Sequence, residues 1–172
     1  MPTPAYLQIE GSTQGAMTTG AFTEVSVGNI YQEGHEDEII VQAFGHRLKV
    51  PTDVQSGQPT GQRRHQPLMI TKTFDKSSPM LYTALATGER LTKCELRFYR
   101  TSTSGFQEHF FTIALEDAII TDINAYMHNC QDPGCAHYTL LEDVAFIYRK
   151  ITWDHVAAGT SGADDWRTPR QA

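Results

Sequence analysis

The sequence predicts a mainly β fold, an antiparallel β-barrel or sandwich with one flanking α-helix and one long extended loop. Apolar and charged residues alternate through residues 93–99, where Cys94, Leu96 and Phe98 are apolar. Successive strand side chains point to opposite faces, so this alternation is typical of a half-buried strand. Similar runs recur at hairpin spacing with turn residues between them, which favours an antiparallel architecture.

The chain has 172 residues and a mass of 19.2 kDa, a size that predicts a single domain over residues 1–172. Further strands are expected where β-branched and aromatic residues cluster. Turns are expected at residues 101–105 and 131–134, which are rich in Ser, Thr, Gly, Asp and Pro. The additional predicted strands are residues 39–50, 68–74, 106–115, 118–128 and 138–153.

One helix is predicted at residues 78–87. Ser77 or Ser78 is a suitable N-cap, and Pro79 suits the first turn. Gly88 suits the C-terminal end. An apolar stripe would pack against the sheet, formed by Met80, Leu81, Ala84 and Leu85.

Charge and hydrophobicity narrow the function classes. The chain carries 14 Lys and Arg residues against 20 Asp and Glu residues, a formal net charge of −6. Nucleic-acid binders depend on basic residues that contact phosphates, so no nucleic-acid partner is expected. No run approaches the ~20 apolar residues of a membrane helix, so no membrane insertion is expected. The first residues lack the features of a signal peptide, which predicts synthesis in the cytoplasm without a signal-peptide route.

Two segments are poor in apolar residues. Residues 51–67 form a long loop with Arg63 and Arg64 as its basic cluster. Loops longer than ~12–15 residues are usually functional or disordered, so this one is either a solvated hairpin loop or an arm that orders on a partner. Residues 157–172 form a C-terminal tail, flexible at residues 159–162, in which Trp166 is expected to dock on the domain.

A turn rich in Cys and His is the first candidate for chemistry. Two thiols and two imidazoles are a ligand set that zinc prefers. The spacing is unusual for a structural zinc site, so an ordinary β-turn is the favoured interpretation. The odd count of three cysteines does not suggest a disulfide framework, and a Cys130–Cys135 bridge would need oxidising conditions. The candidate metal ligands are His128, Cys130, Cys135 and His137.

No convincing active site is visible in the sequence. Residues 34–38 contain one His and three acidic residues, but neighbours on an extended chain point in opposite directions. A solvated acidic turn is therefore expected there. The sequence has neither a nucleophile elbow nor a Gly-rich phosphate loop. We therefore expect no catalytic residues and no cofactor.

The strand predicted at residues 118–128 has two different faces. Ile119, Thr121, Ile123, Ala125 and Met127 are expected to face the core. The opposite face is polar but weakly charged, as expected of a barrel's outer surface or of the wall of a water-filled channel. Its members are Asp122, Asn124, Tyr126 and His128.

Motifs along nearly the whole chain resemble the Hcp family, the haemolysin-coregulated proteins. Each motif is modest by itself, but their order and spacing together are specific. They are AYLQIEG at 5–11, GHEDEIIV at 34–41, HQPL at 65–68, DKSSP at 75–79 with Leu85, FYRT at 98–101, EHFFTI at 108–113, LEDA at 115–118 and YRKITW at 148–153.

The resemblance implies a structural protein of the bacterial type VI secretion system. Members form six-membered rings that stack into a tube, which a contractile sheath surrounds and a spike protein tips. Sheath contraction expels the tube from the cytoplasm to the extracellular space or a target cell, and some effector proteins travel in the ring lumen. The polar face of residues 122–128 is then the candidate lumen wall. The loop at 51–67 is the candidate contact with an adjacent ring or subunit, through Asp53, Gln55, Ser56, Gly57, Gln58, Arg63 and Arg64.

Two other function classes stay open at this point. A small ligand-binding β-barrel would carry a molecule in its interior and would be monomeric. A metal-dependent enzyme would use the Cys/His turn or the acidic residues near His35. Molar mass in solution separates the ring from the carrier, and metal content tests the enzyme.

Overall fold

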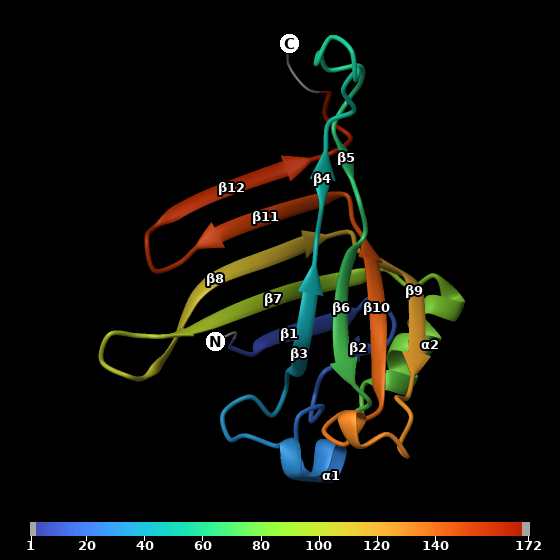
Figure 1. Cartoon of the computed structure of the whole chain (residues 1–172), viewed down its shortest axis with the longest axis vertical. Helices are drawn as coiled ribbons and strands as arrows, with labels where there is room; N and C mark the ends of the chain where they lie inside the picture. Colours follow the sequence, from blue (N-terminus) through green and yellow to red (C-terminus); the bar gives the residue numbers. More distant parts are fainter. Residues whose placement is uncertain (1–2, 170–172) are drawn as a thin grey trace.

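Figure 1 shows the computed structural model of the chain, of which residues 3–169 are described. The ends of the predicted domain and tail, residues 1–2 and 170–172, lie outside this range. The main elements are strands, as the alternating pattern predicted. The strands are β1 (Ala5–Gly11), β2 (Gly15–Ala16), β3 (Ile39–Gly45), β4 (Leu48–Lys49), β5 (Arg64–His65), β6 (Leu68–Thr73), β7 (Leu91–Thr101), β8 (Gln107–Glu116), β9 (Ile119–Tyr126), β10 (Leu141–Ile147), β11 (Lys150–His155) and β12 (Thr160–Asp165).

One antiparallel sheet curls into two crossing layers. Its strand order is β12-β11-β8-β7-β1-β3-β6-β10-β9, with β2 paired to β1. In Figure 1 the strands from β12 to β1 run across the molecule, and β3, β6, β10 and β9 run along its long axis. The path ends at β9 and β12, so the architecture is a sandwich made from one folded sheet and not a closed barrel.

Apolar side chains fill the space between the two layers. Leu7 and Ile9 on β1, Ile70 on β6 and Val144 on β10 are at most 1% exposed. On β6, Ile70 lies between the more exposed Met69 and Thr71, and on β1 the more exposed Gln8 separates Leu7 from Ile9, as a sheet with one buried face requires. The core thus fixes the register of both layers and which face of each points outward.

The predicted helix forms α2 (Ser78–Thr87), with the predicted bounds. Leu81 and Ala84 are buried, and Met80 and Leu85 pack against the core. Gly88 ends the helix in the left-handed conformation, with φ of +67°, which is nearly free of strain only for glycine. The prediction of a single helix is incomplete, because the one-turn helix α1 (Glu24–Val27) and 3₁₀ turns at Gly28–Ile30 and Pro133–Cys135 also form.

Two predicted strands are wrong in their extent. Residues 39–50 divide into β3 and β4, because the chain leaves the layer after Gly45. Residues 138–153 divide into β10 and β11, which lie in different layers: β10 pairs with β6 and β9, and β11 pairs with β8 and β12. The corner is at Tyr148 and Arg149, where the Arg149 amide donates to the carbonyl of Glu116.

The expected flexible tail is also corrected. Thr160–Asp165 forms β12, which pairs along its whole length with β11. Trp166 docks as expected, since its Nε1 donates to the carbonyl of Tyr148, although the ring stays half exposed. Within residues 3–169, no helix has the length and hydrophobicity needed to cross a membrane.

Candidate functional site

The polar face of β9 lies on the outside of the layer that runs along the long axis. Asp122 and Asn124 are exposed, and Tyr126 is partly exposed. Asn124 is opposite Asp143 on β10, and Asp143 is opposite Thr71 on β6. The Thr71 hydroxyl donates to Asp143 at 2.5 Å. Residues opposite one another in an antiparallel pair share a face, so the polar surface extends over three neighbouring strands.

The predicted core face of β9 is wrong on most positions. A register shift beside Thr121 separates two halves of the strand. Before it, the buried residues are Ala118 and Ile120; after it, Ile123 packs against the core. Thr121 and Ala125 are exposed, and Met127 is 64% exposed. A bulge changes which residues face inward, and a strict period of two cannot anticipate that.

The loop at residues 51–67 forms the end of a long, narrow hairpin that projects from the body along the long axis (Figure 1). Strands β4 and β5 pair at its base, and a single bridge joins Thr52 to Pro59 further out. At the tip, Asp53 Oδ1 accepts hydrogen bonds from the Gln55 and Ser56 amides at 2.9 and 2.7 Å. Those bonds hold the pKa of Asp53 below its ordinary value. The tip is therefore a shaped turn with its polar side chains exposed.

The two arginines of this hairpin differ in their surroundings. Arg64 is exposed. Arg63 forms an ion pair with Asp164 on β12, where its side chain is 15% exposed. Arg63 therefore contacts the C-terminal strand of its own chain, while Arg64 stays available on the surface.

The Cys/His turn brings aromatic rings together and not metal ligands. His128 and His137 each lie with their ring centroids 4.2 Å from that of Tyr138. Cys130 is exposed and both Cys130 and Cys135 are free thiols. Within residues 3–169, no three His, Cys, Asp or Glu side chains converge in a way that could hold a metal ion.

The acidic turn before β3 is only partly solvated, so the expectation for residues 34–38 is corrected. Glu38 is 8% exposed. Its carboxylate contacts His35 Nδ1 at 2.6 Å and accepts from Arg97 Nη1 at 3.0 Å. The His35 ring stacks on Tyr6 with a centroid distance of 3.6 Å. These residues fasten the turn to the sheet, a structural role.

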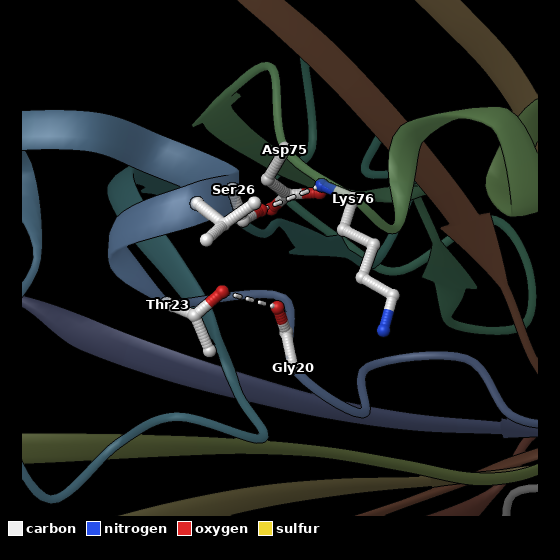
Figure 2. A pocket seen from close by; sticks show the side chains of 6 residues that line it. Gly20, Thr23, Ser26, Asp75 and Lys76 are labelled. Carbon is white, nitrogen blue, oxygen red and sulfur yellow. Dashed lines mark hydrogen bonds between the residues drawn. The ribbon is translucent and has the colours of Figure 1, made fainter.

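A surface hollow of about 510 Å³ lies beside α1. Figure 2 shows Lys76 and Ser26 at its wall, where the Lys76 amide donates to Ser26 Oγ at 2.8 Å. Thr23 Oγ1 donates to the Gly20 carbonyl at 3.1 Å. The hairpin and α1 lie at opposite ends of the long axis in Figure 1.

Comparisons with known proteins agree on one family. The model of the family described as "Type VI secretion system effector, Hcp" matches residues 6–155. "Major exported protein" of Pseudomonas aeruginosa is 66% identical over 169 residues, which cover 98% of both chains. A crystal structure of an Hcp protein is similar with a TM-score of 0.90 and 55% identity, over 95% of this chain and 99% of that one. "Secreted protein Hcp3 from Pseudomonas aeruginosa" is similar with a TM-score of 0.83 and 55% identity, over 96% and 99%.

Proposed function

Because this chain belongs to the Hcp family of type VI secretion proteins, a family of secreted structural proteins and not of enzymes, we propose that it is the subunit of the secretion tube. Six copies form a ring, and rings stack into a tube that a contractile sheath surrounds and a spike protein tips. Sheath contraction expels the tube to the extracellular space or into a target cell.

The projecting hairpin is the observation that carries this proposal. Its tip stands clear of the body (Figure 1), and Val54 at the tip is 99% exposed. A fully exposed apolar residue on a shaped turn loses water on contact with another copy, which favours association. The hairpin tip, Asp53 to Gln58 with Arg64, is the proposed contact with an adjacent ring or subunit.

The polar outer face of β9 and β10 supports a lumen for cargo. Asp122, Asn124 and Tyr126 present hydrogen-bonding groups on an exposed sheet face, and His128 follows with its ring 5.6 Å from that of Tyr126. A wall of hydrogen-bonding groups with few charges stays hydrated, which suits reversible contact with a carried protein. We therefore assign this face to the lumen, where effectors are carried.

A deletion within the hairpin tests the assembly role. Removing residues 55–60 is expected to leave rings of six times the mass of the shortened subunit, measured by light scattering, because the sandwich core is untouched. Electron microscopy of the same sample is expected to show no tubes, and export is expected to stop. Replacing residues 55–60 with glycine and serine is the matched control, because it removes the side chains but keeps the length of the hairpin. Normal tubes from the deleted protein would overturn the assignment.

The alternative function, a small-ligand carrier, requires a different interior from that of a tube subunit. A carrier needs an interior cavity, whereas the interior between these layers is packed with apolar side chains such as Leu7, Ile70 and Val144. We therefore retain the tube subunit as the proposed function. A monomeric mass in solution would favour the carrier.

A further inference from the structure

The hairpin at residues 46–66 has little to hold its direction. Two residue pairs join β4 to β5, and one bridge joins Thr52 to Pro59. A two-stranded hairpin alone is marginally stable in water, because few contacts offset the entropy of ordering its backbone. An assembly element that projects from the body needs a fixed direction, so contacts at the hairpin base decide where its tip points.

One carboxylate of the C-terminal strand, that of Asp164, contacts two side chains of the returning arm of the hairpin: Arg63, which precedes β5, and His65, which lies on it. Arg63 donates to Asp164 through Nε at 2.5 Å and through Nη2 at 2.7 Å. His65 Nε2 contacts the same Asp164 Oδ2 at 2.6 Å. A bidentate guanidinium–carboxylate pair fixes orientation as well as distance. The His65 side chain is 6% exposed and that of Asp164 is 24% exposed, so water screens this cluster only in part.

Arg63 also binds the backbone beyond β12. Its Nη2 donates to the carbonyl oxygens of Asp165 at 2.8 Å and Thr168 at 2.9 Å. The guanidinium therefore connects the returning strand of the hairpin to the end of β12 and to the residues that follow it.

A second chain of contacts fixes the outgoing side of the hairpin. The Tyr148 hydroxyl, at the corner between β10 and β11, lies 2.6 Å from His46 Nε2 and 2.8 Å from His65 Nδ1. The donor in each of these contacts depends on the histidine tautomers, and the Tyr148 hydroxyl can donate to one ring while it accepts from the other. Burial lowers the pKa of His46, and burial together with the charge of Asp164 raises the pKa of Tyr148, which keeps the phenol protonated.

We infer that Asp164 is a positioning residue for tube assembly: it clamps the base of the hairpin through Arg63 and His65 and so sets the direction of the hairpin tip. This inference rests on the proposed function, because the hairpin is the proposed contact between copies. The C-terminal strand β12 thereby takes part in assembly through the hairpin that it holds.

Asp164→Asn tests the clamp with little change in shape. The amide presents N–H groups where Arg63 and His65 already present donors, so at least one of those hydrogen bonds is lost. Asp154→Asn is the matched control, because Asp154 lies on β11 and accepts a hydrogen bond from Ser161 within the same pair of strands. Hydrogen exchange of residues 50–62 in the assembled ring is the measurement, with light scattering to confirm ring size and electron microscopy to count tubes.

Asp164→Asn is expected to speed exchange in residues 50–62 by about tenfold or more, with the rest of the chain unchanged. Rings are expected to stay hexameric while tubes become fewer, and Asp154→Asn is expected to match the unaltered protein. If Asp164→Asn exchanged at the unaltered rate in the hairpin, the clamp would be overturned. Faster exchange with normal tubes would support the clamp and count against the hairpin as the assembly contact.

Arg63→Lys is the second variant, for use if Asp164→Asn fails to fold. Lysine keeps the positive charge but cannot make the bidentate pair, so hairpin exchange is again expected to rise while the core stays protected. An unchanged exchange rate in Arg63→Lys would overturn the clamp by itself.

Discussion

Lys72 and Glu142 form an ion pair inside the protein, with Nζ and Oε1 2.6 Å apart and both side chains 0% exposed. Lys72 also pairs with Asp75 at 3.1 Å and donates to Ser78 Oγ at 3.0 Å. Asp75 precedes α2 and Ser78 begins it, while Lys72 lies on β6 and Glu142 on β10. The ammonium group therefore joins two strands to the start of the helix.

Replacing Lys72 with Met is expected to lower the free energy of unfolding by about 3–5 kcal/mol, because two carboxylates lose their buried partner. Urea denaturation followed by circular dichroism measures it. Lys150→Met is the control, since Lys150 and Glu116 pair at the surface and such pairs contribute about 0–1 kcal/mol. The double variant Lys72→Met with Glu142→Leu is expected to recover part of the loss. Equal losses in Lys72→Met and Lys150→Met would contradict a structural role for the buried pair.

Acid is expected to release the hairpin. Hydrogen bonds from Arg63 lower the pKa of Asp164 below its ordinary value of 3.8. A lowered carboxyl pKa contributes stability above that ordinary value, and the contribution disappears as the pH falls through the folded-state pKa. The difference in hairpin protection between the unaltered protein and Asp164→Asn is therefore expected to be full at about pH 6 and to shrink below about pH 4. A difference that stays constant across this range would show that Asp164 does not act through its charge.

The buried thiol of Cys94 and the exposed thiol of Cys130 are expected to react at different rates. Burial raises the pKa of Cys94 to about 12, whereas Cys130 is exposed. Because the thiolate is the reactive form, Cys94 is expected to alkylate more than about 100-fold more slowly than Cys130 in the folded protein. Timed iodoacetamide labelling with peptide mass spectrometry measures both, and labelling in urea is the control that should equalise them. Early modification of Cys94 in the folded protein would mean that β7 opens locally.

Asn124→Arg tests the lumen assignment. Asn124 is exposed, so ring assembly and stability are expected to change by less than about 0.5 kcal/mol. Six added positive charges in the lumen are expected to reduce the proteins that are co-exported with the ring by about tenfold, which corresponds to 1.4 kcal/mol. Quantitative mass spectrometry of the culture supernatant is the measurement. Ala86→Arg, on the exposed side of α2, is the matched control, and an equal effect of both variants would remove support for the lumen face.

Elements with local signals were predictable from the sequence. Helix α2 has its predicted bounds, with Pro79 in its first turn and Gly88 in the left-handed conformation at its end. The predicted serine cap is wrong in its mechanism, because Ser77 makes no side-chain capping hydrogen bond. Strand β7 was found through alternation, which a sheet with one buried face produces, and β8 through its β-branched and aromatic residues. The candidate lumen residues Asp122 and Asn124 lie on an exposed face, as their polarity indicated.

Elements that depend on distant parts of the chain were not predictable. Thr160–Asp165 has few β-forming residues and becomes a strand because β11 offers it a partner. The corner at Tyr148 reflects a change of layer, which no local pattern records. Glu38 can be buried because Arg97, 59 residues later in the chain, donates a hydrogen bond to its carboxylate. Asp164 was visible only as part of an acidic pair in a polar tail, and its partner Arg63 lies 101 residues earlier.

That separation has a consequence for the order in which the subunit matures. Synthesis proceeds from the N-terminus, so the hairpin leaves the ribosome 101 residues before the carboxylate that holds it. Until Asp164 arrives, the hairpin has only its own few pairings, and its tip points in no fixed direction. Under the proposed function, β12 thus couples the readiness of the hairpin for assembly to the synthesis of residues 160–165, so a nascent chain does not join other copies before that strand is made.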